Sequence, residues 1–302
     1  MKYQYVPLLG IQQTLYQIPP AQRFDAYLGT MMESIIDADD GTSRRGNELE
    51  YPPLVNMNPM ANNERLLPIL KHYEEDMNVD SMAKEVVTRL ATIYEDLKPS
   101  AGSISSPFTS DYEDLWKIGC VAVDDSGGSW TNKIDVEYEH LFDNKRKMYK
   151  RGWLDVILWT SDSNSEEVDS ITQNIESCIH RFVYQQQQHD GRNNDDLCLA
   201  DMLDQEAWVW DQVRITSKKS NHVDEDDDED IQRVIQILRE NGQATDYPTL
   251  IAGLFGDVAA IESGHPSLNL GTSSRRFNSG LDLCKYGLWK RGSTDGGGGS
   301  SQ

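Results

Sequence analysis

The sequence lacks the short motifs that would assign the chain to a known class of enzyme. It contains no GxSxG segment of a serine hydrolase, no HExxH zinc-binding helix and no GxGxxG dinucleotide loop. It also lacks the GxxxxGK spacing of a phosphate-binding loop. No unit recurs at a fixed period, so solenoids and propellers are not expected. None of these motif-bearing classes is therefore indicated.

Long apolar runs are also missing. No stretch reaches the roughly 18 consecutive apolar residues that cross a bilayer, and the N-terminus lacks the basic start and apolar block of a secretion signal. We therefore expect a cytoplasmic protein that does not contact a membrane. The four cysteines are scattered without a CxxC pair, which favours reduced core thiols over a zinc site: Cys120, Cys178, Cys198 and Cys284.

Basic residues are scarce. The chain has 28 lysines and arginines against 50 acidic residues, and its formal net charge is −22. Direct binding of nucleic acid is not expected, because such binding depends on many contacts between cations and phosphates. Residues 224–230 are all acidic, but the rest of the chain is acidic as well.

Apolar residues recur at helical spacing in several places, and this predicts a helix-rich protein. The stripes lie within residues 24–35, 82–97, 168–182, 231–238 and 250–258. Two apolar runs predict strands, at 118–123 and 153–159, and the second is apolar enough to be a central strand. Residues 134–142 fit either a helix or a strand. We therefore expect a helix-rich α+β fold with a small central sheet flanked by amphipathic helices.

The predicted domain organisation is one globular domain over residues 1–291, with a possible internal boundary at 99–110, where serine, glycine and proline are frequent. Residues 217–230 are expected to form a charged mobile loop. Residues 292–302 are rich in glycine and serine, which is typical of a flexible tail.

Asp155 is the first candidate functional residue, because it interrupts an otherwise apolar strand. A buried carboxylate is costly unless it is paired or protonated, and such groups are frequent at catalytic sites. The partners considered are Lys150, Arg151 and His180. The alternatives are a structural ion pair and an exposed position on an edge strand.

A divalent metal site is a second candidate. Glu137 and His140 share a helix face if residues 134–142 are helical, and Glu176 and His180 are spaced to share another. Two imidazoles and two carboxylates form an acceptable mixed ligand set. The alternative is that Glu176 and His180 form a simple surface pair.

A third candidate is a local cluster of cations in this acidic chain, made of Lys145, Arg146, Lys147, Lys150 and Arg151. Such a cluster suits an anionic ligand, with the backbone of Gly127 and Gly128 as donors and Trp130 as part of a pocket wall. The alternative is that the cations neutralise nearby acidic surface.

Two functional hypotheses follow. The first is an enzyme or ligand-binding protein for an anionic small molecule, with its pocket at the carboxyl end of the strands near Thr160. Asp155, His140 and His180 would be catalytic, and the reaction would be a metal-assisted hydrolysis or transfer. The second is a non-catalytic acidic module that binds a basic protein, in part through residues 224–230.

Overall fold

The computed structural model describes residues 2–36, 43–95, 115–126, 132–143, 148–161, 168–188, 197–217, 228–271 and 277–290. Contacts within the chain divide it into two compact units, Met1–Arg192 and Asn193–Gln302. A single domain over residues 1–291 with a possible internal boundary at 99–110 stays a prediction. Within the described ranges, no helix is both long enough and apolar enough to cross a bilayer.

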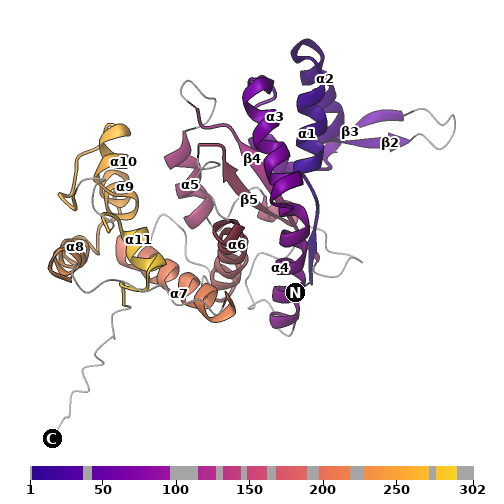
Figure 1. Cartoon of the computed structure of the whole chain (residues 1–302). Coiled ribbons are helices and arrows are strands. Elements are labelled where there is room, and N and C mark those ends of the chain that lie inside the picture. The colour runs from indigo at the N-terminus through magenta and orange to yellow at the C-terminus, as the bar shows by residue number, and fades with distance from the viewer. Residues whose placement is uncertain are drawn as a thin grey trace, which may run out of the picture. The chain divides into compact units, whose positions relative to one another are not determined.

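The first unit contains a three-stranded parallel sheet with the order β1 (Lys2–Tyr5), β4 (Leu115–Val123), β5 (Trp153–Trp159), which Figure 1 shows among the helices. β4 and β5 pair from Lys117 and Trp153 to Val123 and Trp159. Because the strands are parallel, their carboxyl ends meet at one edge of the sheet. Both strands predicted from the sequence are therefore confirmed.

β5 differs from its predicted central place. Within the described residues it pairs with β4 alone, yet six of its seven residues are buried. The burial comes from helices on both faces. On one side β5 contacts α6 (Val168–Gln188), and on the other it contacts the 3₁₀ helix η1 (Pro52–Asn56). Its apolar composition therefore reflects two covered faces and not a second strand neighbour.

β4 is completed on its other side by a helix side chain. β1 is short and ends opposite Ile118. Beyond that point Gln12, from α1 (Leu9–Gln17), donates to the Ala122 carbonyl at 2.9 Å and accepts from the Ala122 N–H at 2.8 Å. Gln12 is fully buried. Its amide therefore satisfies backbone groups that a longer β1 would have paired.

The remaining elements of the first unit are mostly helical. The predicted stripe at 168–182 forms part of α6, and that at 82–97 forms α4 (Val79–Ile93) up to Ile93, with Leu97 outside the described residues. The two helices pack on each other. The ambiguous segment 134–142 is helical, as α5 (Lys133–Phe142), and the Asn132 side chain caps it by accepting from Ile134 N. The further elements are α2 (Pro20–Met31), α3 (Asn63–Lys71), the π-helix η2 (His72–Asp76) and the 3₁₀ helix η3 (Tyr149–Arg151).

One predicted stripe is interrupted. The helical pattern over residues 24–35 does not form a single helix, because α2 ends at Met31 and Ile35 belongs to β2 (Met32–Ile36). β2 pairs antiparallel with β3 (Ser43–Leu49). The β-branched Ile35 and Ile36 favour the strand, and this pairing overrides the helical spacing.

The second unit is built from helices in its described part: α7 (Leu199–Ser217), α8 (Asp228–Glu240), α9 (Tyr247–Phe255), α10 (Asp257–Glu262) and α11 (Gly280–Lys285). The stripe at 250–258 is divided at Gly256, whose φ of 90° is left-handed. α9 and α11 approach closely, since a Cβ on Gly280 would lie 2.7 Å from the Gly253 carbonyl oxygen. Together the two units confirm the helix-rich α+β class.

Candidate functional site

Polar and charged side chains gather where β4 and β5 end. Asp124 and Asp125 follow β4 directly, and Thr160 and Ser161 follow β5. The Thr160 N–H donates to the Val123 carbonyl at 3.1 Å, so the two strand ends are held side by side. Two cations from different helices join them. We call this set the strand-end cluster: Arg65, Asp124, Asp125, Lys133, Thr160 and Ser161.

Asp125 is the most extensively bonded carboxylate of the cluster. It accepts from the Ser161 N–H at 2.9 Å, from the Ser161 hydroxyl and from the Thr160 hydroxyl at 3.2 Å. Lys133 Nζ lies 3.5 Å from its Oδ2 atom. Burial alone would raise the pKa of Asp125, but the bonds from Ser161 and the charge of Lys133 hold it below its usual value. Asp125 is therefore ionised at neutral pH.

Asp124 forms the other half of the cluster. It forms an ion pair with Arg65 and accepts from the Ser126 N–H at 3.0 Å and the Ser126 hydroxyl at 2.7 Å. Arg65 also donates to the Thr160 hydroxyl at 2.8 Å, so its guanidinium joins the two strand ends. The Asp124 side chain is 8% exposed, whereas that of Arg65 is 35% exposed. The cation, and not the carboxylate, is therefore the part that solvent reaches.

The first turns of two helices present the two cations. Arg65 lies in the first turn of α3, where the Asn62 side chain caps the helix by accepting from Glu64 N at 2.8 Å. Lys133 opens α5, and its Nζ atom lies 3.4 Å from the Ser161 hydroxyl and 5.5 Å from the centre of a Trp159 ring. Its side chain is 30% exposed. Both cations can therefore reach a ligand while they hold the carboxylates.

The pocket near Thr160 stays a prediction, and the cluster at the strand ends is built from other residues than those predicted for it. Arg65, Lys133, Asp124, Asp125 and Ser161 were not predicted as site residues. A usable signal was present, because acidic and hydroxyl residues follow each parallel strand directly. No local sequence pattern indicates Arg65, because only the tertiary fold brings α3 close to the cluster.

Several predicted ligand-binding residues cannot be placed. Gly127, Gly128, Trp130 and Lys147 lie outside the described residues, as do the Lys150 side chain and residues 218–227. The predicted loop at 217–230 is too long, because Ser217 ends α7 and Asp228 begins α8. Arg151 belongs to η3 and is exposed. The predicted anion site at this cluster of cations therefore stays a prediction.

Asp155 is fully buried, is hydrogen-bonded to one side chain and lies close to a second. Its Oδ2 atom accepts from the Asn56 amide at 2.9 Å and lies 3.1 Å from His140 Nε2. These partners differ from Lys150, Arg151 and His180, which the sequence analysis considered. Asp155 points to the face of β5 that η1 contacts, where Asn56 ends that helix. The structure thus joins two of the three predicted catalytic residues.

His180 and Glu176 lie elsewhere, at the contact between α6 and α4. Both are buried, so they do not form a surface pair. Glu176 forms an ion pair with Arg89, and His180 Nδ1 lies 2.6 Å from the Tyr94 hydroxyl. Burial, followed by the charges of Arg89 and Arg181, lowers the pKa of His180 to about 3. His180 is therefore neutral at neutral pH.

The predicted metal set remains a hypothesis. Glu137 and His140 lie on α5 and Glu176 and His180 on α6. Among the residues that the structure describes, no three His, Cys, Asp or Glu side chains are grouped so as to hold a metal ion. Measuring the metal content of the protein beside His140→Ala and His180→Ala variants tests the set directly.

No family model, curated protein or solved structure matches this chain. Function must therefore be argued from the chemistry of its own residues.

A pair of acidic side chains in the first unit was not predicted. The Tyr5 hydroxyl donates to Asp80, the second residue of α4, and Asp80 is hydrogen-bonded to Glu74 of η2. Burial, then the hydrogen bond and charge of Asp80, raises the pKa of Glu74 to about 7. Burial also raises the pKa of Asp80. Three elements build this pair, which explains why no local sequence pattern indicates it.

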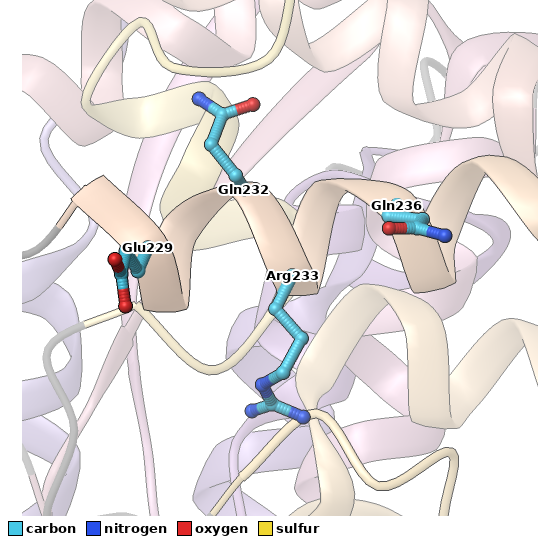
Figure 2. A pocket seen from close by; sticks show the side chains of 4 residues that line it. All are labelled: Glu229, Gln232, Arg233 and Gln236. Atoms are coloured by element: carbon cyan, nitrogen blue, oxygen red, sulfur yellow. The ribbon is translucent and has the colours of Figure 1, made fainter.

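The second unit carries a shallow depression along α8, lined by Glu229, Gln232, Arg233 and Gln236 (Figure 2). Arg233 donates to the carbonyls of Asn269 and Leu270 at 2.9 and 2.7 Å. Asp257 accepts from Leu268 N and Gly271 N. Arg233 and Asp257 thus hold the segment that follows α10.

Proposed function

We propose that the chain binds an anionic small molecule at the carboxyl ends of β4 and β5. The observation that carries this proposal is the convergence of Arg65 and Lys133, from two separate helices, on the hydroxyls of Thr160 and Ser161. In open sheets with parallel strands, ligands commonly bind beyond the carboxyl ends of the strands.

The chemistry of the cluster supports an oxyanion as the ligand. A guanidinium binds carboxylate or phosphate through two parallel hydrogen bonds, and an ammonium adds a second positive charge. Both cations are already held in place by Asp124 and Asp125, so little side-chain freedom is lost on binding. The hydroxyls of Thr160 and Ser161 already donate to Asp125, so the donors left for an anionic ligand are the guanidinium of Arg65 and the ammonium of Lys133.

The proposal extends to reaction class and location. The reaction class proposed with it is metal-assisted hydrolysis or transfer, in which a divalent metal ion bound together with the anionic ligand would act as the Lewis acid. We assign no proton transfer at this site to His140 and Asp155, because Asp155 lies five residues before Thr160 along β5, a distance of roughly 16 Å in an extended strand. A cytoplasmic location is supported by the four cysteines, none of which is in a disulfide.

The test is calorimetric titration of the protein with inorganic phosphate, pyrophosphate and citrate, each with and without Mg²⁺. We expect at least one probe to bind. Arg65→Gln should weaken that binding by roughly 10- to 100-fold, as expected when about 1.5–3 kcal/mol of charge-assisted hydrogen bonding is lost.

Lys84→Gln is the matched control, because it removes one positive charge from an exposed position of α4. It should leave the affinity within about twofold. If no probe binds, or if Lys84→Gln weakens binding as much as Arg65→Gln, the proposed site is wrong. Circular dichroism of each variant separates lost binding from lost folding.

A further inference from the structure

Arg23 of α2 is fully buried, and the hydrogen bonds that the structure describes for it all go to oxygen atoms, of Ile18, of the segment before α3 and of the first residue of α3. Its guanidinium donates to the Pro59 carbonyl at 3.0 Å, the Ala61 carbonyl at 2.9 Å and the Ile18 carbonyl at 3.2 and 3.3 Å. It also donates to the side-chain oxygen of Asn63. Arg23 therefore binds the segment that leads into α3 at three points.

The charge of Arg23 has no carboxylate beside it among the hydrogen-bond partners that the structure describes. A buried guanidinium is costly unless its hydrogen bonds are well made. Here the dipoles of backbone carbonyls offset the cost of burying the charge. The hydrogen bonds form only while residues 58–63 keep their backbone conformation. The free energy that stabilises Arg23 is thus tied to the shape of this segment.

Tyr16 of α1 strengthens the same arrangement. Its hydroxyl donates to the Asn58 carbonyl at 2.6 Å, and the Arg23 guanidinium carbon lies 4.9 Å from the centre of its ring. The Asn58 side chain accepts from Met60 N at 3.0 Å and closes a turn. The segment 58–63 is therefore held by a cation, a phenol and its own turn.

This segment continues directly into the residue that serves the strand-end cluster. Asn62 caps α3 and Asn63 is its first residue. Arg65 follows two residues later, about 3 Å along the helix axis. A shift of the first turn of α3 would carry the Arg65 guanidinium away from Asp124 and Thr160. The position of Arg65 therefore depends on the bonds that Arg23 makes.

We propose that Arg23 is a positioning residue, which fixes the first turn of α3 so that Arg65 can bind the anion at the strand ends. The inference rests on the proposed function of the strand-end cluster. Arg23 itself does not touch the ligand. It acts through the Pro59 and Ala61 carbonyls and the Asn63 side chain.

The test uses Arg23→Lys, which keeps the charge but cannot donate to all of these oxygens at once. Hydrogen exchange of the Glu64, Arg65 and Leu66 amides should become at least about tenfold faster, while the amides of α6 keep their rates. Arg239→Lys, at an exposed position in the second unit, is the matched control. It should change neither the exchange rates of residues 64–66 nor those of α6. Unchanged exchange at residues 64–66 would overturn the inference.

A second measurement separates positioning from general loss of stability. The affinity for whichever of phosphate, pyrophosphate or citrate binds the wild-type protein is measured in Arg23→Lys, Arg65→Gln and the double variant. Positioning predicts that Arg23→Lys weakens binding about tenfold and that the double variant binds no more weakly than Arg65→Gln alone. Fully additive losses would show that Arg23 does not act through Arg65.

Two further outcomes are also decisive. If Arg23→Lys does not fold, Asn63→Ala removes a single acceptor of Arg23 and should produce the same faster exchange and weaker binding. If the wild-type protein binds none of the three anions, the proposed function fails. The exchange result then decides by itself whether Arg23 fixes the first turn of α3.

Discussion

A carboxylate inside an apolar strand has to be compensated, and Asp155 has two groups for this purpose. Its Oδ2 atom meets the Asn56 amide at 2.9 Å and His140 Nε2 at 3.1 Å. The amide and the imidazole come from chain segments about 100 and 15 residues away. Removing the charge of Asp155 therefore disturbs η1, β5 and α5 together.

The Asp155→Asn variant tests whether these two neighbours compensate the buried charge, because it replaces one carboxylate oxygen by an NH₂ group. The asparagine keeps the shape but loses the charge that faces His140, and we expect the free energy of unfolding to fall by about 3 kcal/mol. Urea unfolding measures the change. Glu85→Gln, which neutralises an exposed carboxylate on α4, is the control and should lie within about 0.5 kcal/mol of the wild type. Equal effects of the two substitutions would contradict the role of Asp155.

Glu74 gives a pH dependence whose sign can be stated. Its pKa in the folded chain, about 7, is above the ordinary value of 4.5, so the folded state holds the proton more tightly than the unfolded state. Its stabilising contribution is fully present below pH 4.5 and is lost as the pH rises through 7. Between pH 5 and pH 8, the wild-type protein should therefore lose more stability than a Glu74→Gln variant.

Urea unfolding at several pH values measures that difference. Glu75→Gln is the natural control, because Glu75 is the exposed neighbour of Glu74 in η2. Its pH profile should follow that of the wild type. A Glu74→Gln profile parallel to the wild-type profile would mean that Glu74 does not hold the extra proton.

At the scale of elements, local patterns predicted those segments whose burial follows from their own sequence. The apolar runs at 118–123 and 153–159 form β4 and β5, and the stripe at 168–182 forms part of α6. β1 escaped prediction because its four residues alternate between exposed and half-buried and contain no aliphatic side chain. It is a strand because β4 offers it a partner, and that partner is far away in the sequence.

The candidate site, too, could be predicted from the sequence only in part. Its location near Thr160 was predictable, because polar residues that follow parallel strands meet at one edge of the sheet. The contribution of Arg65 was not, since it depends on where α3 begins relative to β4. His140 was chosen for its spacing from Glu137, but the structure pairs it with Asp155 instead.

Gln12 provides a test of how α1 is joined to the sheet. Gln12→Ala would leave the buried N–H and carbonyl of Ala122 without the two bonds that the amide supplies. We expect a loss of about 3 kcal/mol in the free energy of unfolding, measured in urea. Gln17→Ala, at an exposed position near the end of α1, should change it by less than about 0.5 kcal/mol. A loss in Gln12→Ala no larger than in this control would show that the amide pairing does not stabilise the sheet.

At the scale of the whole molecule, the second hypothesis, an acidic module that binds a basic protein, makes a prediction of its own. Residues 224–227 lie outside the described residues, and α8 begins at Asp228. Deletion of residues 224–230 should weaken binding to a basic probe such as polylysine, and binding should fall steeply as salt is raised. Binding that survives the deletion unchanged, measured by calorimetry at two salt concentrations, would exclude these residues as the contact.

The pairing of Gln12 with Ala122 joins residues 110 positions apart in the sequence. A ribosome adds about 5–20 residues per second, so roughly 5–20 s pass between the synthesis of Gln12 and that of its partner. During that interval β1 and α1 have been made, but the strand that covers them has not. Until then α1 and β1 can pack only on the helices made earlier, α3 and α4, and the Gln12 amide has to wait for the backbone groups that it binds.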